Sequence, residues 1–120
     1  MRAQAPAAIG LTAVPDPLAA MQPRADEAAA LLRLLGNPHR LLILCALVEG
    51  EHSVGQLQAR LPLSQSALSQ HLARLRAAGV VVTRRAGQQI FYALRPGPVT
   101  VVMETLHRVY CEDMVSTKSS

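Results

Sequence analysis

Residues 61–79, LPLSQSALSQHLARLRAAG, predict a helix with defined ends, and they constrain the fold more than any other stretch. Ser64 is a favourable N-cap because its hydroxyl can accept a hydrogen bond from a backbone N–H one turn into the helix. Pro62 cannot continue a preceding helix, and Gly79 suits the C′ position that ends one. The apolar residues recur at i, i+4 and i+7 and share one face: Leu68, Leu72 and Leu75.

The remaining surface of this helix is polar and uncharged in its first two turns and basic further on. The uncharged set comprises Gln65, Ser66, Ser69 and Gln70. Short polar side chains at the start of a helix can read base edges in a DNA groove, and Arg74 and Arg76 can reach phosphates. A solvated amphipathic helix without a ligand is the alternative, and this stretch alone does not separate the two.

Composition favours one small helical domain. The chain has 120 residues, half of them hydrophobic and three aromatic, so the core must be built from Leu, Val and Ala. The formal net charge is +4 and eleven of the twelve basic residues are Arg, which is only a weak indication of nucleic-acid binding. Two cysteines do not form a disulfide framework, and no apolar run reaches membrane-spanning length. We expect a cytoplasmic protein with no membrane association.

An arm and a first helix are expected at the start of the chain. Residues 1–22 are rich in Ala and Pro and show no helical period, so we interpret them as a mobile arm; a tail without a role is the simpler alternative. Residues 23–35 predict the first helix, because Pro23 suits a first turn and Gly36 ends the pattern. Its apolar stripe comprises Ala28, Leu31, Leu32 and Leu35.

Two shorter helical patterns follow. Asn37 and Pro38 provide the N-cap and the first position of a second helix, which Gly50 closes. Its predicted apolar stripe comprises Leu41, Leu44, Cys45 and Val48. Ser53 and Gln56 are spaced as a capping box, so a short third helix begins after Ser53. The side of that helix that we expect to be buried comprises Leu57 and Leu61.

A hairpin is predicted after the helix at 61–79. Val80–Val82 and Ile90–Tyr92 are β-prone runs, and the glycine-containing tip between them carries Arg84 and Arg85 on its flank. A hairpin that follows a DNA-reading helix is a wing, whose tip can touch the DNA backbone or minor groove. The alternative is an exposed turn that two arginines keep soluble.

The last predicted helix spans residues 99–115 and has a broad apolar face. That face comprises Val99, Val102, Met103, Leu106, Val109 and Tyr110. So apolar a terminal helix in so small a chain indicates a subunit interface. We therefore expect one domain over residues 23–115, followed by a tail at 116–120.

Three motifs carry a likeness to a known family: LGNPHRL at residues 35–41, LSQHL at 68–72 and RRAGQQIFY at 84–92. With the order of elements, they resemble the ArsR/SmtB family of bacterial winged-helix repressors over about residues 24–115. The resemblance implies a mainly helical winged helix-turn-helix with a small hairpin, and a homodimer built on the first and last helices. It also implies repression of a double-stranded DNA operator that an inducer relieves. The predicted DNA-binding residues are Gln65, Ser66, Ser69, Gln70, His71, Arg74, Arg84 and Arg85.

Two details of the resemblance concern histidine and metal ligands. His71 matches a histidine in the DNA-reading helix of the family, and contact with DNA and packing at the helix edge both stay open. Many members sense metals through Cys-x-Cys in the third helix, whereas Val54–Arg60 contains no thiol. Others use Asp and His on the last helix, whose pattern is not reproduced here by Glu104, His107, Glu112 and Asp113. We expect neither a metal site nor a cofactor.

Cys45 and Cys111 occupy positions that resemble those of the persulfide-sensing SqrR/BigR branch of the family. That likeness implies a redox-sensing pair: reactive sulfur species, such as persulfides or polysulfides, link the two thiols and the affinity for DNA falls. The residues alone favour two inert thiols, because free Cys on an apolar stripe is commonly a small buried hydrophobe. His107 lies four residues before Cys111 and can lower its pKa, while the negative helix end opposes this.

Other functions stay open. A metal- or arsenite-responsive repressor could use both cysteines and His107, although two sulfurs are fewer than a closed site usually needs. An inducer-independent DNA-binding antirepressor would not use the thiols at all. An enzyme is not expected, because no nucleophile–base pair or phosphate-binding loop is present.

Overall fold

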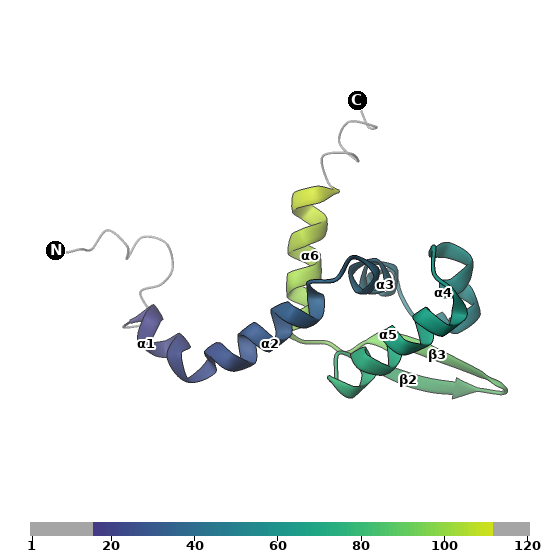
Figure 1. The fold of residues 1–120 in the computed structure, drawn as a ribbon, viewed down its shortest axis with the longest axis horizontal. Coiled ribbons are helices and arrows are strands. Elements are labelled where there is room, and N and C mark those ends of the chain that lie inside the picture. The colour runs from purple at the N-terminus through teal and green to yellow at the C-terminus, as the bar shows by residue number, and fades with distance from the viewer. Residues whose placement is uncertain (1–15, 112–120) are drawn as a thin grey trace, which may run out of the picture. The chain divides into compact units, whose positions relative to one another are not determined.

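The computed structural model describes residues 16–111, whose elements are labelled in Figure 1. In chain order they are α1 Pro17–Met21, a 3-10 turn η3 Gln22–Arg24, α2 Ala25–Leu35, α3 Pro38–Val48, β1 His52–Ser53, α4 Val54–Arg60, α5 Gln65–Ala77, β2 Val81–Ala86, β3 Gln89–Leu94 and α6 Pro98–Tyr110. The predicted mainly helical fold with a small hairpin is confirmed. The described residues fall into two compact units that divide after Arg33.

The first unit is helical from Pro17, which the sequence interpretation missed. The Asp16 carboxylate accepts hydrogen bonds from the N–H groups of Leu18 (3.1 Å) and Ala19 (3.3 Å), and Pro17 takes the first helical position. The expectation of a non-helical segment up to residue 22 is therefore wrong for residues 17–21, because a capping aspartate outweighs the missing apolar period. Residues 1–15 of the predicted arm and the predicted tail at 116–120 lie outside the described residues.

The predicted helix starts are confirmed at α3, α4 and α5. Asn37 Oδ1 accepts from the N–H of Arg40 at 3.0 Å, and Ser64 Oγ accepts from the N–H of Ala67 at 3.1 Å. Both bonds of the capping box between Ser53 and Gln56 are present, at 3.1 and 2.8 Å. These caps pair backbone donors that a helix start otherwise leaves unsatisfied.

The end of α5 is a Schellman motif, as Gly79 at C′ predicted. Gly79 has φ +77°, its N–H donates to the carbonyl of Arg76, and the N–H of Val80 donates to that of Leu75. The motif turns the chain directly from α5 into β2.

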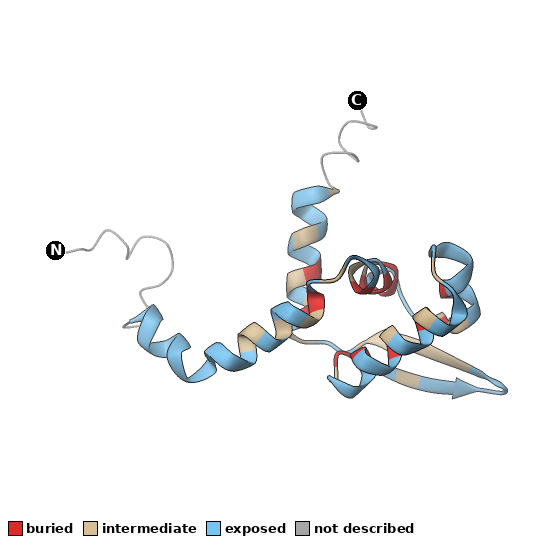
Figure 2. Ribbon diagram, viewed as in Figure 1, coloured by how far each residue is buried: buried red, intermediate tan, exposed pale blue. Residues whose placement is uncertain are grey.

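The core lies between α3, α4, α5, the sheet and α6, and Figure 2 shows buried positions gathered on α3 and on one side of α5. Its most enclosed side chains are Ile43, Leu44, Leu57, Leu68, Leu72, Leu75 and Val81. The predicted stripe of α3 is partly wrong: Ile43, Ala46 and Leu47 are buried, whereas Cys45 is half-buried and Val48 is exposed. Since α3 is apolar all round, its periodicity does not single out one face.

The hairpin belongs to a three-stranded antiparallel sheet with strand order β1-β3-β2. β2 pairs with β3 from Val81↔Leu94 to Ala86↔Gln89, and Gly87 at φ +64° makes the turn. The third strand, β1, is new: His52 pairs with Tyr92 and Ser53 with Phe91. A two-residue strand has no detectable alternation in sequence, so only its pairing reveals it.

α6 begins at Pro98 and ends at Tyr110, with Cys111 as its C-cap; the predicted extension through residues 112–115 lies outside the described residues. Val99 and Met103 are buried, whereas Val109 and Tyr110 are 58% and 73% exposed. In residues 16–111 no single helix is long and apolar enough to cross a membrane; one bent pair, Pro17–Leu35 with Pro38–Val48, passes the length and composition test.

Candidate nucleic-acid interface and thiol pair

The predicted base-reading side chains are all exposed on α5. They comprise Gln65, Ser66, Ser69 and Gln70, and the predicted phosphate contact Arg74 is exposed as well. The helix is held from its other side by leucines that are almost fully buried: Leu68, Leu72 and Leu75. This anchoring fixes which residues α5 presents to solvent, and it leaves a polar surface that ends in two arginines, Arg74 and Arg76.

A hollow of about 450 Å³ lies between α5 and the hairpin. It is lined by Ser69, Ala73, Arg76, Ala77 and Tyr92. The position of Tyr92 beside α5 was not predicted, because the face on which it lies depends on the strand register, which the sequence does not give. The hollow brings a phenol and a guanidinium to the same surface as the polar residues of α5.

His71 packs against a second histidine. Its ring lies edge-on to that of His39 in α3, with 5.8 Å between the ring centroids, and the residue is half-buried. Burial, followed by the positive charges of Arg40, His39 and Arg74, lowers the pKa of His71. The packing role that the sequence left open is thus present in the structure. Because its pKa is lowered, His71 is neutral at neutral pH.

The two wing arginines have different surroundings. Arg84 makes an ion pair with Glu51, and its guanidinium carbon lies 4.9 Å from the centroid of the Phe91 ring. The Arg84 hydrogen bond lowers the pKa of Glu51, so the carboxylate is charged at neutral pH. Arg85 is exposed, and its side chain has no hydrogen-bond or ion-pair partner within residues 16–111.

The cysteines are free thiols on two helices that pack together, Cys45 in α3 and Cys111 at the end of α6. Both are half-buried. Burial raises the pKa of Cys45, and the charges of Cys111 and Glu49 raise it further, while Arg60 acts in the opposite direction. The charge of Cys111 thus reaches the Cys45 thiol, in agreement with the predicted packing of their helices. The backbone N–H of Cys111 donates a hydrogen bond to the carbonyl of His107, at 2.8 Å.

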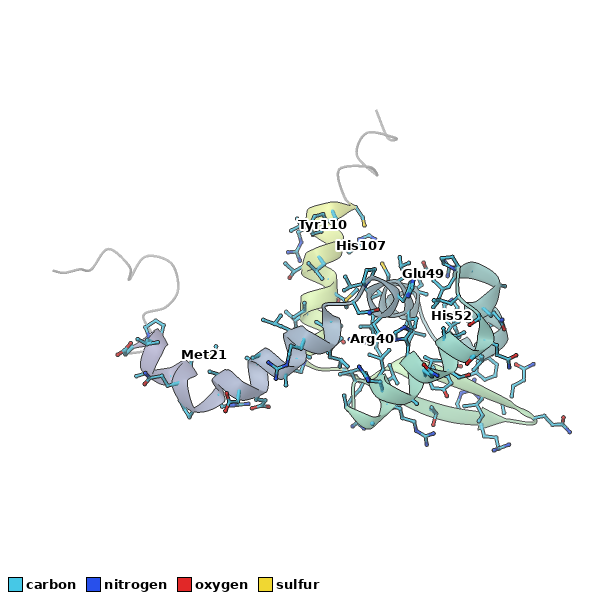
Figure 3. The ribbon with its side chains drawn as sticks, in the orientation of Figure 1. Met21, Arg40, Glu49, His52, His107 and Tyr110 are labelled. Atoms are coloured by element: carbon cyan, nitrogen blue, oxygen red, sulfur yellow. The ribbon has the colours of Figure 1, made fainter. Side chains whose placement is uncertain are left out.

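An ion-pair network that the sequence did not reveal lies beside Cys45. Arg60 of α4 donates two hydrogen bonds to the Glu49 carboxylate, at 2.8 and 3.1 Å. A nitrogen of the same guanidinium lies 3.0 Å from Nε2 of His52, whose Nδ1 is 2.9 Å from the carbonyl of Gly50. Glu49 and His52 of this network are labelled in Figure 3. The network joins the end of α3 to α4, which forms the helix-turn-helix together with α5. No group of three or more His, Cys, Asp or Glu in the described part of the chain could hold a metal ion.

Comparison with known proteins gives consistent matches. Residues 37–83 match the family described as "Bacterial regulatory protein, arsR family". The transcriptional activator HlyU of Vibrio cholerae is 48% identical over 102 residues, which cover 85% of this chain and 94% of that protein. The biofilm growth-associated repressor of Agrobacterium fabrum is 47% identical over 95 residues, covering 79% and 81%.

Solved structures agree in fold as well as in sequence. Reduced HlyU from Vibrio cholerae is 50% identical with a TM-score of 0.72, over 76% of this chain and 96% of that one. The transcriptional repressor BigR from Xylella fastidiosa is 43% identical with a TM-score of 0.71, over 78% of this chain and 92% of that one.

Proposed function

Because this chain belongs to the ArsR family of bacterial regulatory proteins, it is a DNA-binding transcriptional regulator and not an enzyme, and we propose that it is a cytoplasmic repressor switched by its two thiols. In this proposal Cys45 and Cys111 of one subunit become linked through sulfur when a persulfide or polysulfide is present, and the protein then releases its operator. The observation that carries the proposal is the pair of free, half-buried thiols on two helices that pack together, with Cys111 close enough for its charge to act on Cys45.

The DNA-binding half of the proposal rests on exposed side chains of α5 and the wing. Gln65, Ser66, Ser69 and Gln70 contact base edges, and Arg74 contacts phosphate. Backbone contacts are added by Arg76, which lines the hollow that Tyr92 borders, and by the exposed Arg85 of the wing. His71 supports α5 through His39.

The chemical half needs two sulfur transfers and one condensation. Each thiolate attacks the outer sulfur of a hydropersulfide, RSSH, so the RS–S bond breaks and RSH leaves with the proton. Two cysteine persulfides then join: one attacks the other, a trisulfide link forms and hydrogen sulfide leaves. Two protein thiols and two RSSH thus give one trisulfide, two RSH and one H₂S. The inducer is itself the oxidant, so no cofactor is needed.

Distance gives this chemistry its selectivity. A direct disulfide requires Cα atoms within about 7 Å and suitably aimed Cβ atoms, and each inserted sulfur lengthens the link by about 2 Å. Thiols held slightly too far apart therefore accept a polysulfide link more readily than a disulfide. Selectivity for reactive sulfur over peroxide then needs no binding pocket.

The Glu49–Arg60 ion pair supplies a route from the thiols to DNA. Glu49 is the C-cap of α3, one turn beyond Cys45, and Arg60 lies in the last turn of α4. A link that draws Cys45 toward Cys111 displaces α3, and the ion pair passes this displacement to the helix-turn-helix. Since a dimer must meet two half-sites at once, a small change in the setting of α5 lowers affinity.

One experiment tests the proposal on the unmodified protein. The operator is first obtained as the duplex that the reduced protein enriches from a random pool. The protein is then treated with hydrogen polysulfide, peroxide or diamide, and its intact mass is measured beside its operator binding. Polysulfide should add mass in steps of one sulfur, remove both free thiols and release the DNA, and peroxide should release it poorly. Full release by peroxide, or release without loss of the thiols, contradicts the proposed switch.

A second candidate follows from the name of the relative HlyU, which is a transcriptional activator. The chain could act as an antirepressor that displaces another protein from DNA without any inducer. Operator binding would then be insensitive to every thiol reagent in the experiment above.

A further inference from the structure

We infer that Arg84 is a positioning residue that fastens the wing to the α3–β1 connection through Glu51, and that Arg85 is the wing residue that contacts the DNA backbone. The inference rests on the proposed DNA-binding function and assigns different roles to two arginines that the sequence analysis treated alike. It replaces the expectation that both of them touch DNA.

The guanidinium of Arg84 is engaged along one edge and on one face. Nε donates to one oxygen of the Glu51 carboxylate at 3.2 Å, and a terminal nitrogen donates to the other oxygen. One face of the group lies over the ring of Phe91 at 4.9 Å. A forked ion pair with a stacked aromatic ring fixes the plane of a guanidinium as well as its position. The Nε edge of Arg84 is thus occupied by Glu51, and its positive charge is paired within the protein.

The position of Phe91 extends this contact across the whole sheet. Phe91 of β3 is the ladder partner of Arg84 in β2 and of Ser53 in β1. Glu51 lies directly before β1. The ion pair therefore joins the start of β1 to β2, and the ladder joins the same two strands through β3. We call Glu51, Arg84 and Phe91 the wing clamp. It sets the angle at which the hairpin leaves the body of the domain.

Strand alternation places Arg85 on the other face of the hairpin. Successive side chains of a strand point to opposite faces, so Arg85 shares a face with its partner Ile90 and with Tyr92 two residues further on. Tyr92 borders the hollow against α5. Arg85 therefore lies on the face that meets the DNA-reading helix, whereas Arg84 lies on the face toward Glu51.

The clamp is exposed, which limits what it can do. The side chains of Arg84 and Glu51 are 54% and 39% exposed, and ion pairs of this kind contribute little to global stability. Their loss should leave the domain folded and change only the setting of the wing. The effect is expected in DNA affinity, at an interface that the clamp itself does not touch.

The salt dependence of binding separates a phosphate contact from a positioning residue. Affinity is measured over a range of salt concentrations, on a random-sequence duplex of about three helical turns and on the enriched operator. Arg85→Ala should flatten the salt slope by about one unit, because one phosphate contact is lost. Arg84→Ala should weaken operator binding about three- to tenfold and keep the wild-type slope. A slope change for Arg84→Ala equal to that for Arg85→Ala overturns the inference.

Charge reversal provides a second test that does not depend on slopes. Arg84→Glu alone should weaken operator binding, and the double variant Glu51→Arg/Arg84→Glu should recover it, because the ion pair is restored with its charges exchanged. If position 84 touches phosphate, the double variant stays as weak as the single one, and the inference is wrong.

Glu51→Gln distinguishes a clamp from a mask. Loss of the clamp should lower operator affinity, although the protein gains positive charge; if Glu51 merely masks Arg84, the variant binds more tightly and the inference fails. Asp16→Asn removes the same charge from an exposed carboxylate outside both the wing and residues 23–35, and Asn can still cap α1; this matched control should not lose affinity. If the wild type enriches no duplex, the proposed function fails; if it binds DNA and the variants behave otherwise, only the clamp fails.

Discussion

The charges around Cys45 set how readily this thiol reacts. Burial, and then the negative charges of Cys111 and Glu49, raise its pKa, so the thiolate fraction at neutral pH is small and reactivity grows as the pH rises through the raised value. Arg60 opposes this from α4. The Glu49–Arg60 ion pair therefore affects the reactivity of the thiol as well as its connection to the helix-turn-helix.

Substitution of Glu49 and substitution of Arg60 should change the alkylation rate of Cys45 in opposite directions. In a Cys111→Ser background, Glu49→Gln should speed the reaction of Cys45 with iodoacetamide at neutral pH, and Arg60→Gln should slow it. Each change should be below about tenfold, the effect of one pKa unit. The pH dependence of the rate, with urea-unfolded protein as the control, makes the measurement. Identical profiles for the two folded variants would show that these charges do not reach Cys45.

His71 makes stability depend on pH at the contact between α3 and α5. Its pKa is lowered from 6.5 by burial and by Arg40, His39 and Arg74, so the unfolded chain binds this proton more readily than the folded one. The contribution of neutral His71 is therefore complete above pH 6.5 and is lost as the pH falls through the lowered value. Urea unfolding on both sides of pH 6.5 should show this loss, and His71→Gln should reduce it. An unchanged pH dependence in that variant would contradict the assignment.

Among the elements, α5 depends on the backbone conformation of its terminating glycine. Gly79→Ala should destabilise the domain by about 1–2 kcal/mol, because φ there is +77° and nothing lies within 4 Å of an added Cβ to offset the strain. Gly55, in α4, is the matched control, since its Cβ would meet only Ser53 Oγ at 3.9 Å. Gly55→Ala should stabilise by about 0.5 kcal/mol. Thermal unfolding of both variants measures the difference, and equal shifts in Tm would exclude a backbone cause.

Elements with local signals were predictable from sequence. The caps at Asn37, Ser53 and Ser64 and the glycine after α5 act within a few residues. The short stretch of sequence around each of them is therefore enough to predict a helix end. The short helix at Pro17–Met21 is the exception, because one aspartate cap is a weak signal in an Ala/Pro-rich stretch. β1 and the buried face of α3 were missed because long-range pairing and packing decide them.

The candidate site shows the same division. Exposure of the α5 side chains follows from helical period, and it was predicted. Contacts between distant residues were not: Arg84 and Glu51 are 33 positions apart, and Arg60 and Glu49 are 11 apart. Two adjacent arginines look equivalent in sequence, and only the strand register places them on opposite faces of the wing.

For the whole molecule, we propose a two-fold dimer built on residues 23–35 and α6. Exposed apolar side chains on α6 support this seam: Val101, Val109 and Tyr110. A dimer would place two copies of α5 about 34–36 Å apart, as successive major grooves require. Leu106 is half-buried within the chain, so the exposed valines are the cleaner positions to test.

Val109→Lys should yield a folded monomer that has lost operator binding, because a charge enters the seam without disturbing the core. Sedimentation velocity and circular dichroism measure assembly and folding together. His107→Lys adds positive charge two residues earlier, on the opposite side of α6, and should remain dimeric. A dimeric Val109→Lys variant with full affinity would remove this face from the interface.

The measurement that bears most directly on the two-thiol switch compares Cys45→Ser and Cys111→Ser with the wild type. Operator binding is followed by fluorescence anisotropy before and after hydrogen polysulfide is added, and again after a thiol reductant. All three reduced proteins should bind equally well, polysulfide should release the operator only from the wild type, and the reductant should restore that binding. If either single variant releases the operator as the wild type does, the two cysteines do not form the switch.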